Sequence, residues 1–314
     1  MKNSATHPTP FPSLHRRAVN MDFNKMSKSQ KTLCGIAVSY IVYGAMFIGA
    51  PLGLEDSGLK FTGVKSGPIT QAAANWAGVG AIFLGLDNIF VALKCSKEMI
   101  QRTVSLNAIG CIIRLGVFIT AGSQKWGGVH VHKEYLQGLA ITVATLAVCI
   151  DCLRDGYGKA KHPFMGCNSL THGALIVPTA LMMIYIGMML TTDFIGDNYI
   201  TPKGGLRAAE PNAYTQMAWT FTMWFGFMMQ NLVVLGVGKA GEQREFSLLR
   251  VLSVLVAFKL MTDEKSITPP NKQTEGMVVQ AIMLVAYVVA AFGDKIKPAS
   301  KKKAPARGAS KKRK

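Results

Sequence analysis

Long apolar stretches constrain this chain more than any other feature of its sequence. Eight of them have the length that a helix needs to cross a bilayer, roughly 17–25 residues. They lie at 33–54, 68–94, 100–122, 134–153, 168–191, 212–238, 245–262 and 275–293. A soluble helical bundle would show polar stripes at a period of 3.6 residues, whereas these stretches are apolar on nearly all faces. The sequence therefore predicts an all-α polytopic membrane protein with about eight transmembrane helices.

The charge of the chain is concentrated at its two ends. Apolar residues make up 49% of the sequence and charged residues only 17%, yet the formal net charge is +18. Residues 1–32 carry six Lys or Arg and one acid, and residues 295–314 carry ten Lys or Arg and no acid. We therefore expect two disordered basic tails around an almost neutral body. A nucleic-acid-binding globule is not expected, because its charge would lie on a folded face.

The basic residues and the thiols set the expected orientation. Eight spans place both ends on one side of the membrane, and an excess of Lys and Arg marks the cytoplasmic side. No cysteine falls in a predicted outer loop, which fits thiols kept in a reducing compartment. Both termini are therefore expected in the cytoplasm. The last four residues match the dilysine retrieval pattern of the endoplasmic reticulum, and the basic, acid-poor residues 1–20 leave another organelle membrane as an alternative.

The two halves of the body resemble each other. A shift of 143 residues brings identical residues together and also aligns the boundaries of the spans. The matches include Gly44 with Gly187, Trp76 with Trp219 and Asn88 with Asn231. We therefore predict two four-helix repeats, residues 33–167 and 168–294. They are parallel repeats, because an even number of spans makes both halves enter the membrane from the same side.

The second and sixth spans are the predicted contact between the halves. Small residues on one helical stripe allow close helix packing in lipid. We expect Trp224 and Met228 to pack over a groove at Ala81 and Gly85.

Polar side chains inside the spans are the candidates for a binding site. Each charge at the centre of a span costs roughly 2.5–3.5 kcal/mol on insertion, so such groups usually pair with one another or face an aqueous path. We predict a substrate site at Asn88, Asn231, Asp87, Gln230 and Arg114. Asp87 and Arg114 are either a structural ion pair between neighbouring helices or contacts to the ligand.

A second set of charges lies at the inner ends of the spans and is symmetric between the halves. Arg102 matches Arg244, and Asp151 matches Asp294. One interpretation is simple anchoring on the cytoplasmic side. The other is a gate or an anion contact, in which the guanidinium groups donate hydrogen bonds to the two aspartates.

Three functions remain open from the sequence. The leading hypothesis is a secondary transporter or channel-like protein for a small solute, with its site between the repeats. The first alternative is a non-catalytic membrane subunit or organiser that binds partner helices through small-residue stripes. The second is an intramembrane lipid-modifying enzyme that uses Asp151 and Asp155, although no catalytic, cofactor or metal motif is complete. The expected partners are the lipid bilayer, anionic headgroups for the C-terminal tail, a small solute and membrane subunits, but not nucleic acid.

Overall fold

The computed structural model describes residues 23–48, 68–121, 133–154, 169–191, 211–263 and 270–296. These residues form eight long helices and a short 3-10 turn, η1 (Phe23–Lys25), and contain no strand. The helices are α1 (Lys28–Ile48), α3 (Pro68–Lys94), α4 (Lys97–Ala121), α5 (Lys133–Leu153), α6 (Leu170–Thr191), α9 (Pro211–Val237), α10 (Ala240–Asp263) and α11 (Pro270–Ile296). Most of both predicted tails and most of the four predicted outer loops lie outside the described residues.

Each predicted span coincides with one helix, but α1 ends six residues before the predicted end, and α1, α10 and α11 each begin five residues before the predicted start. α1 begins at Lys28 rather than at residue 33. Ser27 precedes it, and its hydroxyl accepts a hydrogen bond from the Gln30 amide (3.3 Å), while the Gln30 side chain accepts one from the Ser27 amide (3.0 Å). This reciprocal capping satisfies amides that have no partner inside the helix. A polar capped turn adds helix that hydropathy alone does not detect.

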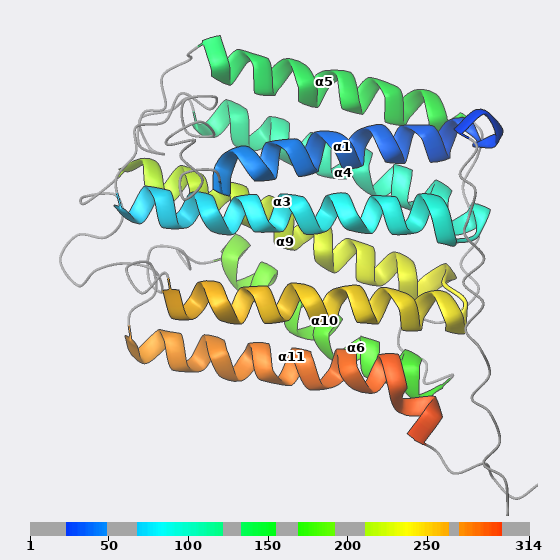
Figure 1. The fold of residues 1–314 in the computed structure, drawn as a ribbon. Helices are drawn as coiled ribbons and strands as arrows, with labels where there is room; N and C mark the ends of the chain where they lie inside the picture. Colours follow the sequence, from blue (N-terminus) through cyan, green and yellow to red (C-terminus); the bar gives the residue numbers. More distant parts are fainter. Residues whose placement is uncertain are drawn as a thin grey trace, which may run out of the picture.

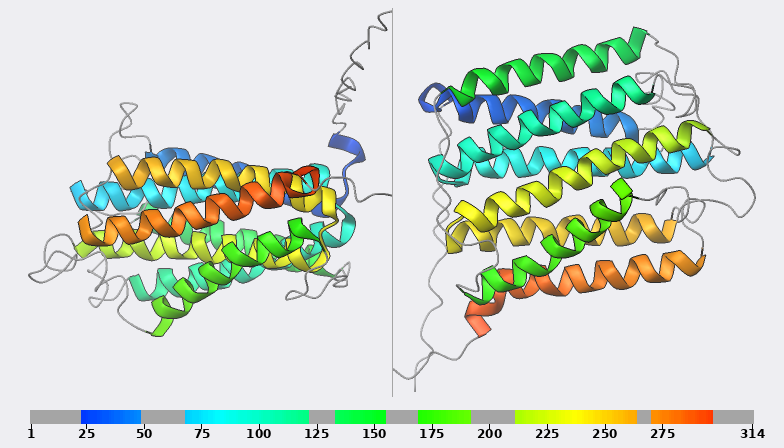
Figure 2. Two further views of the ribbon diagram at one scale, coloured as in Figure 1. Left: turned by 90° about the horizontal axis from the view of Figure 1, so that it is seen from below. Right: turned by 180° about the vertical axis from the view of Figure 1, so that it is seen from behind.

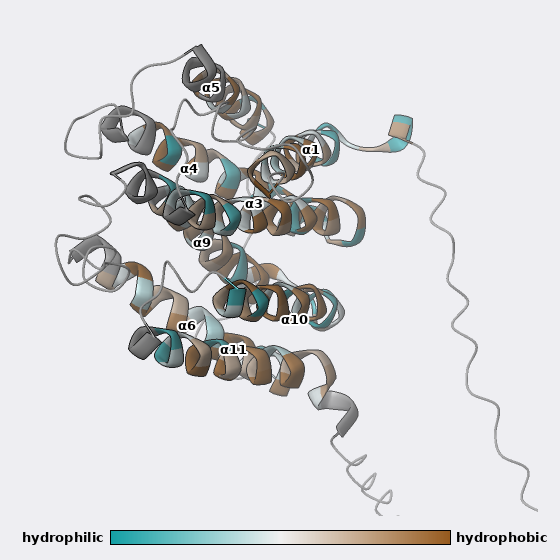
Figure 3. Ribbon diagram, turned by 60° about the vertical axis from the view of Figure 1, so that its left-hand side comes forward, coloured by the Kyte–Doolittle hydropathy of each residue, from teal (hydrophilic) through white to brown (hydrophobic). Residues whose placement is uncertain are grey.

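Five of the eight described helices have the length and apolar character of membrane spans. α1, α3, α6, α9 and α11 each contain a segment long and apolar enough to cross a bilayer. The described apolar part of α5 is shorter, Leu139–Leu153. Apolar residues cover most of the visible length of α3, α10 and α11 (Figure 3). Large apolar side chains such as Val38, Ile184 and Val285 are exposed on the outer surface. A water-soluble monomer rarely exposes apolar surface on this scale.

The helices lie in two layers of four (Figure 2). One layer has the order α1, α3, α10, α11, and the other has the order α5, α4, α9, α6. α3 and α9 pack across the centre between the layers. α1 begins and α11 ends at the same end of the bundle (Figure 1), which we call the terminal end.

The closest helix contact is between α1 and α3. A Cβ added to Gly44 would lie 2.5 Å from the carbonyl oxygen of Gly78, and a Cβ added to Gly78 would lie 2.7 Å from the carbonyl oxygen of Gly44. Gly85 also faces α1, since its Cβ would lie 2.7 Å from Ile41. The small-residue stripe of α3 is therefore covered by α1. The predicted packing of Trp224 and Met228 into a groove at Gly85 is wrong.

α3 and α9 contact each other, as predicted, but through residues other than the predicted ones. Gly80 packs against Met223, and on the opposite helix Gly226 packs against Leu84. The Trp76 and Trp224 rings meet edge to face, with their centroids 6.3 Å apart. A large side chain on one helix thus faces a glycine on the other, at two successive levels of the contact.

Glu242 joins the starts of α4 and α10 at the terminal end. Its carboxylate accepts hydrogen bonds from the backbone amides of Ser96 and Lys239, both at 2.6 Å. We expect Glu242→Ala to lower the free energy of unfolding by about 1–2 kcal/mol, because both amides lose their acceptor. Thermal unfolding in detergent measures the change. Glu245→Ala is the control, since its exposed carboxylate lies 3.9 Å from Lys94. Equal effects of the two substitutions would contradict this role of Glu242.

Candidate functional site

A small buried cavity lies where α3, α4 and α9 meet, and we call it the seam cavity. Its volume is about 20 Å³, which is room for a single water molecule. Four of the five predicted site residues line it, namely Asp87, Asn88, Arg114 and Gln230. They come from three helices and from both halves of the chain. The remaining lining is Tyr40, Leu84, Leu106, Asn107, Gly110, Thr222, Met223 and Gly226.

Asp87 forms a buried ion pair with Arg250 of α10. The Asp87 Oδ2 atom accepts a hydrogen bond from Arg250 Nη2 at 2.6 Å, and both residues are only 1% exposed. The guanidinium lies over the rings of Phe227 (4.2 Å to the centroid) and Phe246 (4.7 Å). Aromatic faces attract a cation, and more strongly when water is excluded. The pair joins the first half of the chain to the second.

The alternative that paired Asp87 with Arg114 is wrong. Asn107 of α4 is level with Asn88, since the two side chains are hydrogen-bonded. Arg114 follows Asn107 by seven residues, which is roughly 10 Å along a helix axis. Arg114 instead donates to the Cys111 sulfur (3.2 Å) and the Gly110 carbonyl (3.3 Å), and its guanidinium lies 4.8 Å from the centre of the Tyr40 ring. It therefore closes the end of the cavity away from Asp87.

Side-chain amides form the polar wall of the cavity. Asn88 Oδ1 accepts a hydrogen bond from Asn107 Nδ2 (2.7 Å), and Asn88 Nδ2 donates to the Leu84 carbonyl (2.8 Å). Gln230 Nε2 donates to the Thr103 hydroxyl at 3.2 Å, which links α9 to α4. Asn107 was not among the predicted site residues, although an asparagine in the middle of an apolar span is itself a signal.

Asn231 lies apart from the seam cavity. Its Nδ2 donates to the Tyr287 hydroxyl of α11 (2.9 Å) and approaches the Met182 sulfur of α6 (3.8 Å). Asn231 therefore joins helices within the second half. The structure places four predicted residues together and this fifth one in a separate network.

Several buried polar atoms around the ion pair have no hydrogen-bond partner among the described residues. They are Asp87 Oδ1, Arg250 Nε, Arg250 Nη1 and Asn231 Oδ1. A buried group left unsatisfied costs about 1–3 kcal/mol, and more when it is charged. Since Asp87 lines a cavity with room for one water molecule, a water there is a candidate partner for its free oxygen.

The predicted gate residues are only partly assembled. Arg102 and Arg244 are half-buried in the first turns of α4 and α10. Asp151 forms an ion pair with Lys28 of α1, and both side chains are half-exposed. The structure therefore gives Asp151 a partner on the helix beside α5 rather than one of the arginines. The side chain of Asp294 lies outside the described residues.

The described residues contain no group of His, Cys, Asp or Glu side chains that could hold a metal ion. Asp155, which the lipid-enzyme alternative requires, lies outside the described residues.

No protein-family model, curated protein or solved structure significantly matches this chain. Function must therefore be inferred from the geometry itself.

Proposed function

We propose that this protein spans the membrane and carries a small polar solute along the seam between two related halves. The convergence of polar side chains on the seam cavity carries the proposal. Asp87 and Asn88 of α3, Arg114 of α4 and Gln230 of α9 reach one buried space. Polar groups in apolar helices are costly, and they usually mark a pathway for solutes, ions or protons.

The packing of the helices supports two pseudo-symmetric repeats. Exchanging α1 with α6, α3 with α9, α4 with α10 and α5 with α11 converts each pair of contacting helices into another pair of contacting helices, although equivalent pairs are not equally closely packed. The exchange turns the α4–α9 contact into the α10–α3 contact. Asp87–Arg250 joins α3 to α10, and Gln230–Thr103 joins α9 to α4. Asp87 and Gln230 are 143 residues apart, so equivalent positions on α3 and α9 each make a link to the other half, although their partners Arg250 and Thr103 are not at equivalent positions.

The observed arrangement corresponds to a closed state. The seam cavity holds only a water-sized particle, so a larger solute requires the halves to separate. Separation at the seam must break the Asp87–Arg250 ion pair and the Gln230–Thr103 hydrogen bond. Rocking of one repeat against the other around a fixed site is the common way in which repeated transporters alternate access. The two links would then control opening.

The alternatives have less support. The partner-binding hypothesis needs an exposed small-residue stripe, and α1 covers that of α3. The lipid-enzyme hypothesis needs a free acidic pair, and Asp151 is engaged with Lys28.

We further propose that both termini lie in the cytoplasm, with the C-terminal tail on anionic headgroups. The membrane would be that of the endoplasmic reticulum or of another organelle.

Solute flux into liposomes tests the proposal. Purified full-length protein is reconstituted and assayed with protons and chloride, using trapped dyes, and with water, urea and glycerol, using light scattering. We expect one of these species to enter faster than it enters protein-free liposomes. Asn88→Leu and Gln230→Leu should slow that flux about tenfold, since each removes a polar wall of the cavity.

Gln273→Leu is the matched control for these two substitutions. It also replaces an amide by leucine, but Gln273 binds the Met261 carbonyl at the opposite end of α11 from the tail. Its flux should equal that of the wild type. If no solute enters faster than in protein-free liposomes, or if both cavity variants transport normally, the proposal is wrong.

A further inference from the structure

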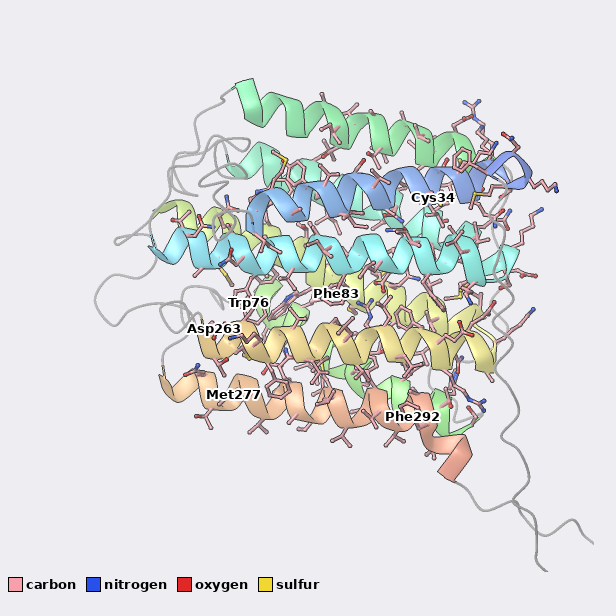
Figure 4. All side chains as sticks on the ribbon, in the orientation of Figure 1. Cys34, Trp76, Phe83, Asp263, Met277 and Phe292 are labelled. Carbon is pink, nitrogen blue, oxygen red and sulfur yellow. The ribbon has the colours of Figure 1, made fainter. Side chains whose placement is uncertain are left out.

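A second and larger cavity lies among α3, α6, α9, α10 and α11, toward the end of the bundle opposite the terminal end. Its volume is about 100 Å³, and we call it the apolar cavity. Aromatic and methionine side chains make up much of its wall, including Trp76, Phe83, Met182, Trp224, Met261 and Met283. Trp76 and Phe83 lie on the side of α3 that faces α10 (Figure 4).

One glutamine in the wall of the apolar cavity has no hydrogen-bond partner among the described residues. Gln280 of α11 lines the cavity, is 9% exposed and forms no hydrogen bond with a described residue. Burying an amide without a hydrogen bond costs about 1–3 kcal/mol by protein mutational data. Trp76 and Trp224 line the same space, and no described residue accepts a hydrogen bond from their indole N–H groups. The wall thus contains three donor side chains without a described partner, beside the polar Ser253 and Tyr185.

A counterpart to this cavity lies on the other side of the α3–α9 contact. It measures about 60 Å³ and is enclosed by α1, α3, α4, α5 and α9, which are the equivalent helices under the proposed repeat. Trp219 and Met223 line it at positions 143 residues from Trp76 and Gly80, which line the apolar cavity. Paired hollows at equivalent positions indicate a feature of the architecture rather than a local packing defect.

The two cavities differ in chemistry. Arg114, Ser39 and Thr142 give the smaller one a polar wall. At the position equivalent to Ser39, the larger one has Met182. Methionine adapts to irregular shapes and makes favourable contacts with aromatic rings. The larger cavity is therefore suited to an apolar guest.

We propose that the apolar cavity binds one flat ring of a membrane-soluble small molecule that carries a single carbonyl group beside that ring. The ring would lie against the indoles and phenyl rings of the wall, which favour edge-to-face and offset contacts. The carbonyl oxygen would accept a hydrogen bond from the Gln280 amide. A dry apolar cavity of about 150 Å³ is known to bind benzene, so a cavity of about 100 Å³ has room for no more than one ring and excludes a lipid headgroup.

Photolabelling of the full-length protein in lipid nanodiscs tests this proposal with benzophenone as the probe. On irradiation, the excited ketone oxygen abstracts a hydrogen atom from a nearby C–H group, and the two carbon radicals join in a C–C bond. Mass spectrometry then identifies the labelled peptide. We expect saturable labelling at Met182, Met261 or Met283. Gln280→Leu, which keeps the side-chain volume, should lower labelling about fivefold to tenfold, the loss expected for one hydrogen bond.

Ala257→Trp and Ala281→Trp form a matched pair of variants. Ala257 lines the cavity, so tryptophan there should abolish the labelling, whereas Ala281 is exposed beside Gln280 and should tolerate the same change. The proposal is overturned if exposed Met183 is labelled as strongly as Met182, or if a folded Ala257→Trp variant labels normally. Competition by stearic acid but not by fluorenone would assign the cavity to an acyl chain and would also overturn it. If Ala257→Trp does not fold, Gln280→Leu alone decides, with unchanged labelling refuting the proposal.

Discussion

Arg250→Met should lower the free energy of unfolding by about 3–5 kcal/mol, because it leaves the Asp87 carboxylate buried without its counter-ion. Both partners are 1% exposed, so water cannot take the place of the lost guanidinium at low cost. The substitution also removes the cation from between the Phe227 and Phe246 rings. Reversible unfolding in mixed detergent micelles, followed by circular dichroism, measures the effect.

The double variant Asp87→Leu with Arg250→Met separates the loss of the pair from the cost of a stranded charge. Replacing a buried ion pair by apolar residues of similar volume is often neutral or stabilising. We therefore expect the double variant to recover most of the stability that Arg250→Met loses. Lys259→Met, which breaks an exposed pair with Asp263, should leave the unfolding midpoint unchanged. A double variant as unstable as Arg250→Met would show that the ion pair is not the reason for the loss.

The positions of the helices could be predicted from the sequence because hydropathy over about 20 residues is a local property. α3 occupies the predicted residues 68–94. Three helices begin five residues before the predicted spans, namely α1 at Lys28, α10 at Ala240 and α11 at Pro270. In α1 and α10, capping by Ser27 and Glu242 extends the helix by a polar turn. Such a turn has helical geometry but not the hydropathy of a span.

Part of the candidate site was predictable for a similar reason. Polar residues inside apolar spans are rare, so Asp87, Asn88 and Gln230 stand out one by one. Their partners could not be derived, because a helical period shows which residues share a face but not which helix covers that face. α10 packs against α3 at the level of Asp87, so Arg250 rather than Arg114 is the counter-ion.

The α1–α3 contact gives the second large expected effect. Gly44→Ala places a methyl group 2.5 Å from the Gly78 carbonyl oxygen and 2.7 Å from Ile82. The carbonyl belongs to the α3 backbone and cannot rotate away, so α1 must shift outward. Overpacking of this kind costs about 1–3 kcal/mol, and the same unfolding assay measures it. Because α1 supplies Tyr40 to the seam cavity, the shift should also alter solute flux.

Two other glycines provide controls that differ from Gly44 only in their surroundings. Gly35 lies on the same helix, and a Cβ there meets no atom within 4 Å. Gly187 occupies the position equivalent to Gly44 in the second half, and it too has open space. Alanine at either position should be neutral or slightly stabilising, because alanine favours a helix over glycine by about 1 kcal/mol. If Gly44→Ala matched these two variants, the close approach of α1 and α3 could not be what holds α1 in place. We attribute the looser packing of α6, and the larger cavity beside it, to the lack of a close backbone contact at Gly187. Equal effects of Gly44→Ala and Gly187→Ala would contradict this explanation too.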